Sequence, residues 1–383
     1  MAKKYSKKVS KKPKKDKKDK KVTKKQQKTK KKPLPKKSLI KKEEKHHKFE
    51  IKSGLEFSDI LTKVVPIKGG KYGVIDEGGE FVIFSINNKK EIKPELKFQI
   101  PQANSFCQLG NGIFVFNSLE YITFWELVGT KLGQLAEYET IHSVVVYAIE
   151  PINENYCAIS GPNDIIELVK FTKQGKLSVE NLDFRKSKIK NKKNKKKSDH
   201  PSSGIGCLYF QKKHSRLLAT HFNDILRVWN CDFAKNKYEL FKEVEPISNY
   251  FGNIIHETKN KILIGGRDLI AILNNDTYEI TDFINLGNKG YEIFSMEMIK
   301  YYNFKEFAVC GLRSGKILGV DIDNKRIEFT KIKQNNTGKD NEMEVKNGKI
   351  SFYGENISYI KKVENQNLIL VASHDHILKL YEY

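Results

Sequence analysis

The chain contains 383 residues, of which 39% are apolar, and this is enough for a substantial core in one large domain or two ordinary ones. Its net charge of +24 is unevenly placed, because residues 1–48 carry +20, residues 185–198 carry +9, and the rest of the chain carries −5. We expect neither a secretory signal nor a membrane span, since the N-terminus has no apolar stretch and no run of about 18 apolar residues occurs.

The spacing of the cysteines indicates the redox state of the compartment in which the protein resides. The five cysteines lie far apart and form no CxxC pair. This pattern favours a reduced intracellular protein with mostly buried thiols over a disulfide framework. The residues are Cys107, Cys157, Cys207, Cys231 and Cys310.

Residues 1–48 alternate lysine pairs with Ser, Thr, Asp, Gln and Pro and contain only scattered apolar residues. Such a segment cannot bury enough apolar surface to offset the entropy lost on ordering, so we expect a disordered polybasic tail. Lysine is a hydrated point charge, which suits neutralisation of a phosphate backbone better than base reading or stacking. Together with the run at 185–198, the tail predicts contact with a nucleic acid or another polyanion through Lys11, Lys12, Lys14, Lys15, Lys17, Lys18, Lys24, Lys25, Lys30, Lys31, Lys32, Lys192, Lys193, Lys195, Lys196 and Lys197.

From Phe49 onward one unit recurs along the chain. It consists of a short apolar strand, a turn containing Gly, Asn or Asp, and a second strand with an aromatic or aliphatic residue at its fifth position. In 216–230, for example, two apolar segments flank the turn residues Asn223 and Asp224. The fifth positions are 41 to 61 residues apart and form a column of Phe84, Trp125, Val169, Trp229, Leu273, Val320 and Tyr381.

The period of this repeat predicts the fold. Units of about 40 to 45 residues with four short strands are typical of β-propeller blades. The two longest intervals hold obvious insertions, a basic one at 185–203 and a polar one at 333–349. We therefore predict an all-β, seven-bladed propeller of four-stranded antiparallel blades over residues 49–383.

The two ends of the predicted propeller complement each other. The last column residue, Tyr381, lies two residues before Tyr383, so the seventh blade has no outer strand of its own. The alternating segment Phe49–Ile51 has no blade of its own. We expect this N-terminal segment to supply the missing strand and close the ring, which removes open sheet edges.

These repeats resemble the WD-repeat β-propeller family over about residues 49–383. That family places an Asp in the inner turn, six residues before a Trp that is followed by Asp. The resemblance implies a rigid scaffold that binds proteins through its faces without catalysis. It also implies that Trp125, Trp229, Tyr381 and Asp375 are structural markers of the repeat. The matches are Asp375 before Tyr381-Glu382, Asn223 before Trp229-Asn230, and Asn163 before Val169-Lys170, whereas Trp125 stands alone and no Gly-His dipeptide occurs.

Motifs for catalysis are weak. The stretch 311–317 has three residues rather than four between its glycines, and Ile317 replaces the Ser or Thr of a phosphate-binding loop, so a β-turn is favoured. His374, Asp375 and His376 are suitable metal ligands, but successive strand residues face opposite ways. With no GxSxG motif or nucleotide fingerprint, we predict no catalytic residue, metal or cofactor. Scattered carboxylates could still meet in a central channel.

The combined pattern predicts a non-enzymatic scaffold, monomeric within a larger complex, that binds proteins through its propeller faces. Nuclear or nucleolar localisation in an RNA-associated assembly, such as one in ribosome biogenesis, is the leading hypothesis, because the lysine runs resemble nuclear-import signals. The alternative is a cytoplasmic interaction module whose tail binds acidic cytoskeletal or membrane surfaces. A tail that is only a solubilising extension is the third interpretation.

Overall fold

The structure is a computed structural model, and it describes residues 48–142, 145–186, 204–244, 254–287, 291–301, 305–328, 331–333 and 356–383. The predicted polybasic tail lies outside these residues except for Lys48, as do 187–203 of the basic insertion and 334–355 around the polar one. The lysines predicted to contact a polyanion, in 11–32 and 192–197, are therefore all outside the described residues.

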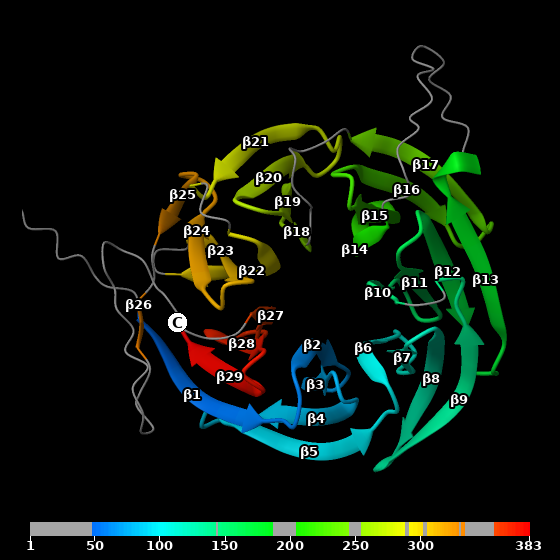
Figure 1. Cartoon of the computed structure of the whole chain (residues 1–383), viewed down its shortest axis with the longest axis horizontal. Coiled ribbons are helices and arrows are strands. Elements are labelled where there is room, and N and C mark those ends of the chain that lie inside the picture. Colours follow the sequence, from blue (N-terminus) through cyan, green and yellow to red (C-terminus); the bar gives the residue numbers. More distant parts are fainter. Residues whose placement is uncertain are drawn as a thin grey trace, which may run out of the picture. The chain divides into compact units, whose positions relative to one another are not determined.

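Seven β-sheets surround a central axis as the blades of a propeller (Figure 1). Blades 1 to 3 consist of β2 (Leu61–Ile67), β3 (Lys71–Asp76), β4 (Glu80–Ile86) and β5 (Ile92–Gln99); β6 (Ala103–Gln108), β7 (Phe114–Ser118), β8 (Tyr121–Val128) and β9 (Lys131–Glu139); and β10 (Ala148–Pro151), β11 (Tyr156–Ser160), β12 (Ile165–Phe171) and β13 (Leu177–Asp183). Blades 4 to 6 consist of β14 (Ile205–Gln211), β15 (Arg216–His221), β16 (Leu226–Asp232) and β17 (Lys237–Val244); β18 (Ile254–Glu257), β19 (Lys261–Gly265), β20 (Leu269–Asn274) and β21 (Ile280–Asn285); and β22 (Ile293–Tyr301), β23 (Lys305–Leu312), β24 (Ile317–Asp321) and β25 (Arg326–Glu328). Blade 7 consists of β27 (Ile357–Lys362), β28 (Leu368–Ser373), β29 (Ile377–Glu382) and β1 (Lys48–Glu56), with the short β26 (Lys331–Lys333) as a fifth strand.

Two 3-10 helices, η1 (Phe184–Lys186) and η2 (Lys212–His214), interrupt the strands. No helix within the described residues is long and apolar enough to cross a membrane. The first strand of each blade lies nearest the axis and the fourth lies at the rim (Figure 1). The prediction of an all-β, seven-bladed propeller is confirmed.

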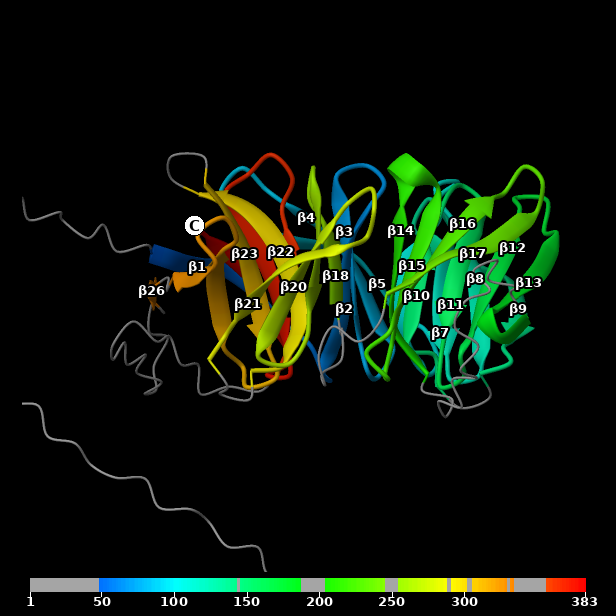
Figure 2. The same cartoon turned by 90° about the horizontal axis from the view of Figure 1, so that it is seen from above.

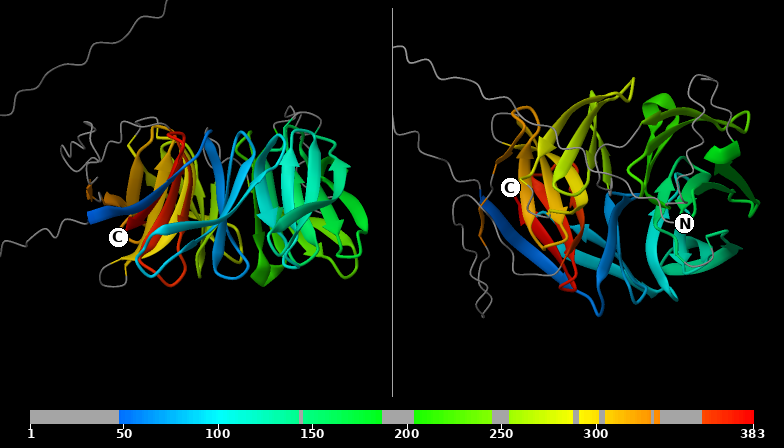
Figure 3. Two further views of the ribbon diagram at one scale, coloured as in Figure 1. Left: turned by 90° about the horizontal axis from the view of Figure 1, so that it is seen from below. Right: turned by 45° about the horizontal axis from the view of Figure 1, so that its top comes forward.

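The ring closes through the N-terminal strand, as the sequence predicted. β1 pairs antiparallel with β29, with Glu50 opposite Glu382 and Glu56 opposite Ile377. Figure 3 shows β1 along the outer side of β29, near the C-terminus. β26 then pairs parallel with the start of β1, an addition that the repeat pattern did not predict. Blade 7 therefore joins the two ends of the propeller and leaves no blade incomplete.

The antiparallel order gives the propeller two faces with different turns (Figure 2). We call one the hairpin face, because it carries the turns from first to second and from third to fourth strands. The linker face carries the turns from second to third strands and the connections between blades. The described hairpin face comprises 68–70, 87–91, 109–113, 129–130, 152–155, 172–176, 212–215, 233–236, 258–260, 275–279, 322–325 and 363–367, and the described linker face comprises 57–60, 77–79, 100–102, 119–120, 140–142, 145–147, 161–164, 184–186, 204, 222–225, 266–268, 286–287, 291–292, 313–316 and 374–376.

The core is divided among the gaps between blades. Each pair of neighbouring blades encloses one cluster of buried apolar side chains. In β15, Leu217 packs toward blade 3 and Leu218 toward blade 5, because successive strand residues point to opposite faces. This arrangement explains why the inner strands are apolar at nearly every position.

The column of fifth positions marks one equivalent place in every blade. All seven side chains pack in the gap between their own blade and the preceding one. Trp229 is 3% exposed and lies in the cluster between blades 3 and 4. Tyr381 lies between blades 6 and 7, and Trp125 packs partly buried between blades 1 and 2. These side chains hold neighbouring blades together and do not face a ligand surface.

Five outer strands carry a β-bulge beside the column residue. In β9, for example, Phe124 and Trp125 of β8 pair with Ala136 and Gln134, which leaves Leu135 as the extra residue. Bulges twist an edge strand and discourage edge-to-edge pairing. Four of the extra residues are exposed at the rim, and two of these, Leu135 and Phe241, have large apolar side chains.

Candidate functional site

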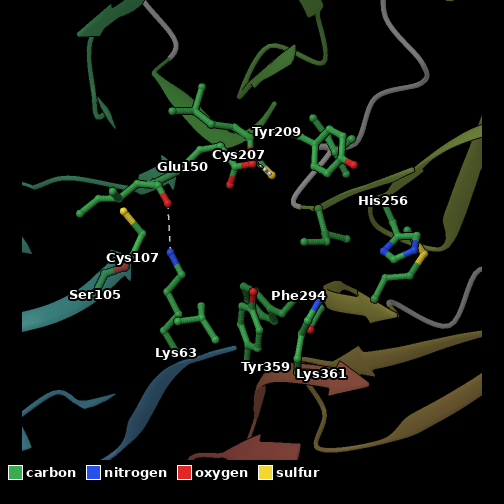
Figure 4. Close-up of a pocket in the computed structure, with 18 of the residues that line it drawn as sticks. Lys63, Ser105, Cys107, Glu150, Cys207, Tyr209, His256, Phe294, Tyr359 and Lys361 are labelled. Carbon is green, nitrogen blue, oxygen red and sulfur yellow. Dashed lines mark hydrogen bonds between the residues drawn. The ribbon is translucent and has the colours of Figure 1, made fainter. Parts of the chain in front are cut away.

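The innermost strands of all seven blades enclose a central cavity of about 500 Å³ (Figure 4). Its wall contains acids, bases, hydroxyls and thiols from the first strand of each blade. The channel is thus a polar site that the repeat pattern alone did not reveal. Its ionisable and polar side chains include Lys63, Ser105, Cys107, Glu150, Cys207, Tyr209, His256, Glu257, Glu297, Tyr359 and Lys361.

Glu150 and Lys63 connect three blades across the channel. The Lys63 Nζ donates to the Ile149 carbonyl oxygen at 3.0 Å, and the Phe210 amide donates to Glu150 Oε1 at 3.0 Å. Burial raises the pKa of Glu150 to about 7, although the Phe210 amide and the charge of Lys63 act in the opposite direction. Burial also lowers the pKa of Lys63. The Glu150 carboxyl therefore titrates near neutral pH.

A second set of polar contacts lies across the channel. Lys361 and Glu297 form an ion pair at 2.9 Å. Burial opposes the charge on Lys361, but the Glu297 carboxylate outweighs it, and the pKa of Lys361 is raised. The Tyr209 hydroxyl donates to Glu257 at 2.9 Å. The lysines thus lie on blades 7 and 1 and the carboxyl groups on blades 3, 5 and 6, so the channel does not present a single sign of charge to a ligand.

The channel contains converging ionisable groups, the arrangement that an enzyme would need. Burial raises the pKa of Cys107 and of Cys207 to about 12, so both thiols are protonated near neutral pH and are poor nucleophiles. Both Glu150 and Glu297 already accept contacts from neighbouring strands. These groups serve contacts between blades, and the predicted lack of catalysis stays a prediction.

The linker face carries exposed apolar side chains over blades 2 to 4. The Thr140 amide donates to the Glu120 carbonyl oxygen at 2.8 Å, which holds the turn at 119–120 beside the loop at 140–142. The Tyr147 and Phe222 rings meet edge to face, with centroids 5.2 Å apart. Tyr147 also lines the channel. We call this surface the apolar patch, and it consists of Leu119, Ile141, Val145, Tyr147 and Phe222.

Leu119 has a backbone and an exposure that are unusual for leucine. Its φ is 55°, in the left-handed region that residues with a Cβ rarely adopt, and its side chain is 50% exposed. A leucine at this position therefore neither stabilises the turn nor increases the solubility of the chain. The signal in the sequence is an apolar residue between two strands of the repeat, and the column of strand positions does not report on turn residues.

The motifs weighed in the sequence form turns. The Gly315 amide donates to the Leu312 carbonyl oxygen at 3.0 Å and closes a β-turn between β23 and β24, as predicted for 311–317. Asp375 accepts hydrogen bonds from the Ser373 hydroxyl and the Ile377 amide, and it contacts Lys379. Its carboxylate therefore stabilises the turn in which it lies. The described residues contain no group of three side chains placed to hold a metal ion.

Buried polar side chains also join blades 3 and 4 at the linker face. His221 Nδ1 lies 3.1 Å from Asp164, and the Arg227 guanidinium lies 3.5 Å from the centre of the Phe184 ring. Arg227 donates to Glu243 at 2.8 Å. Burial lowers the pKa of His221. This network fixes the described residues that precede the basic insertion.

All five cysteines are free and buried, which matches the expected buried thiols. Neither a known protein family nor a curated protein matches the sequence. Among solved structures, the crystal structure of the WD40 β-propeller domain of Doa1 is similar, with a TM-score of 0.60 and 12% sequence identity over 88% of this chain and 97% of that chain. At this identity the similarity shows the fold alone.

Proposed function

We propose that this chain, a WD40-type β-propeller, is a non-enzymatic scaffold that holds a protein partner on the apolar patch of its linker face. Propellers of this fold generally serve as protein-interaction scaffolds. We place it in an RNA-associated assembly of the nucleus or nucleolus, such as a preribosomal particle, where its lysine-rich segments contact phosphate backbones.

The exposed apolar patch carries the proposal for protein binding. Leu119, Ile141, Val145 and Tyr147 are each at least 38% exposed, and they come from two adjoining loops rather than from scattered positions. Contiguous apolar surface on a soluble protein commonly marks an interaction site. The left-handed backbone at Leu119 also supports a binding role for the patch, since a strained and exposed leucine serves a contact with another molecule better than it serves the fold.

The charge distribution supports the RNA-associated setting. Residues 1–48 and 185–198 together carry +29, whereas the remainder carries −5. Lysine clusters of this density bind phosphate backbones without regard to sequence, and the binding weakens steeply with salt. The fold itself assigns no such role, so localisation and partners require direct tests.

Proximity labelling in the native cell tests the protein partner. We expect Leu119→Ser with Ile141→Ser to reduce labelling of the main partner proteins at least about tenfold, because two apolar side chains leave the contact surface. The matched control is Leu135→Ser with Phe283→Ser, which removes equally exposed apolar side chains from outer strands. Equal labelling by both variants would contradict the patch as the docking surface.

Localisation is tested with a fluorescent tag on the full chain and on a variant that lacks residues 1–47. Nuclear or nucleolar signal from the full chain, together with nuclease-sensitive recovery of RNA-associated proteins, is the expected result. Cytoplasmic signal from both proteins, with recovery of cytoskeletal or vesicle proteins after nuclease treatment, would overturn the nuclear assignment and favour the cytoplasmic module.

A further inference from the structure

The hairpin face concentrates lysine. Its described turns contain ten lysines and no arginine, against six acidic residues. The lysines occur on five of the seven blades, so they are spread around the face and do not form one cluster. The described turns of the linker face contain eight acidic residues, three arginines and only two lysines. The hairpin-face lysines are Lys68, Lys89, Lys90, Lys173, Lys176, Lys212, Lys213, Lys235, Lys259 and Lys325.

The strand ends repeat this difference. Fourteen strands of the seven four-stranded blades begin at the hairpin face, and eight of them start with Lys or Arg. The other fourteen begin at the linker face, and none of those starts with a basic residue. The eight residues are Lys48, Lys71, Lys131, Arg216, Lys237, Lys261, Lys305 and Arg326.

A lysine-rich composition does not explain the difference between the described turns. These turns are short and join the same strands, so a general excess of lysine would fill them alike on both faces. The longer linker-face connections that contain 187–203 and 334–355 carry further lysines, and both segments lie outside the described residues. The described turns of the two faces differ fivefold in lysine number. The mildly acidic total for the propeller sequence conceals this separation, because acids of the linker face and the rim offset the lysines of the hairpin face.

Most of these lysines are available to a ligand. Six of the ten are exposed and form no ion pair with any described residue. The other four contact acids, as Lys213 contacts Asp276 at 3.2 Å. Exposed surface pairs of this kind contribute little and exchange readily for a stronger anion. The six are Lys68, Lys89, Lys173, Lys176, Lys212 and Lys259.

The face offers charge without aromatic or apolar contacts. The two aromatic rings in its described turns, Phe233 and Tyr278, pack inside the clusters between blades. Val128 is the one large exposed apolar side chain that borders its described turns. Single-strand binding uses exposed rings for stacking, and membrane docking uses inserted apolar side chains. The described surface therefore suits the phosphate backbone of a base-paired nucleic acid best.

We infer that the hairpin face is a binding surface for the phosphate backbone of a double-stranded nucleic acid, read without sequence preference. The inference deepens the proposed function, on which its RNA-associated setting rests, but it assigns binding to the folded propeller itself. The ammonium groups neutralise phosphates and release counterions, which makes the affinity dependent on salt. The apolar patch of the linker face stays the surface proposed for the protein partner.

The ends of the basic segments add a second observation. β1 begins with Lys48 at the hairpin face, since Glu50 lies opposite Glu382 at the far end of β29. Lys48, the first described residue after the polybasic tail in the sequence, therefore belongs to a strand end at this face. Residues 184–186 and Gly204, which flank the basic insertion, belong to the linker face. The described residues next to the two lysine-rich segments thus lie at opposite faces.

The test measures binding of the full chain to an RNA duplex of about 20 base pairs of arbitrary sequence, at several salt concentrations. The variant Lys173→Ser, Lys176→Ser, Lys259→Ser removes three exposed charges from the hairpin face. We expect its affinity near 0.1 M salt to fall at least about tenfold, and the slope of log K against log salt to decrease by roughly 2 to 3. The matched control, Arg267→Ser, Arg313→Ser, Lys316→Ser, removes three charges from the linker face outside the basic insertion and should change the slope by less than about 1.

Equal losses in the two variants would overturn the inference, because they would report net charge alone. Loss of all binding on removal of residues 1–47, with no effect of the hairpin-face variant, would also overturn it while leaving the proposed function intact. If the hairpin-face variant loses RNA binding but the cellular protein shows no RNA-associated partners, the inference stands and the proposed assembly falls. Binding to anionic vesicles but not to the duplex would assign the face to a membrane and contradict it.

Discussion

The hairpin face and the linker face belong to the same seven sheets, yet their turns carry different chemistry. The described hairpin turns are rich in exposed lysine, with their aromatic rings packed inward. In the described linker turns eight acids outnumber five basic residues, and over blades 2 to 4 these turns expose the apolar patch around Leu119 and Tyr147.

This difference shows which residues the fold constrains, those of the strands, and which it leaves free to vary, those of the turns. Strand residues such as Leu217 and Leu218 pack on neighbouring blades in opposite directions, so their identity is constrained by the core. Turn residues meet few such constraints. Two kinds of surface can therefore be placed on one scaffold without altering its core, and each can be changed separately.

The largest expected effect comes from disrupting the packing between blades, on which both faces depend. Trp229→Ala should lower the free energy of unfolding by about 3 to 5 kcal/mol, because the indole is buried between blades 3 and 4. Urea unfolding measures this, and binding at both faces should fall together. Phe283→Ala, at an exposed ring, is the control and should cost less than about 1 kcal/mol. A similar loss in both variants would show that the column does not hold the blades.

The next effect lies in the channel between the faces. Burial raises the pKa of Glu150 from 4.5 to about 7, so the folded chain binds its proton more tightly than the unfolded chain. The resulting stability is fully present below about pH 4.5 and is lost as the pH rises through about 7, by at most about 3 kcal/mol.

Glu150→Gln should remove this pH dependence between pH 4.5 and 8, measured as the difference in urea midpoint from the parent protein. Glu77→Gln, at an exposed carboxyl of the linker face, should leave it unchanged. Parallel pH profiles for the parent protein and Glu150→Gln would show that the channel carboxyl is not perturbed. The channel would then contribute no pH dependence of its own, and the two faces would differ only in their turns.

The smallest effect distinguishes stability from binding at the linker face. Leu119→Gly should raise the free energy of unfolding by about 0.5 kcal/mol, because glycine adopts the positive φ without strain and this outweighs its extra chain entropy. The same variant should bind the protein partner less tightly. Leu135→Gly, within the outer strand β9, should lower stability by about 0.5 to 1 kcal/mol. Destabilisation by Leu119→Gly would show that this leucine serves the fold.

Much of the fold could be predicted because its signals are local. The column from Phe84 to Tyr381 repeats at the period of a blade, and Phe49–Ile51 lacked a blade of its own. The channel could not be predicted in this way. Glu150 becomes significant only where the Phe210 amide and Lys63 approach it, and these come from β14 and β2, which are distant in sequence.

By itself the sequence determined the number of blades, the closing strand and the presence of two basic segments. Each of these follows from composition, from the period of the repeat or from the alternation of neighbouring residues along a strand. Only the tertiary structure decided which turns share a face, because that depends on strand direction in seven sheets and on closure of the ring. The lysines of 172–176 and 212–215 are consequently part of one surface, although the sequence shows them as separate turns.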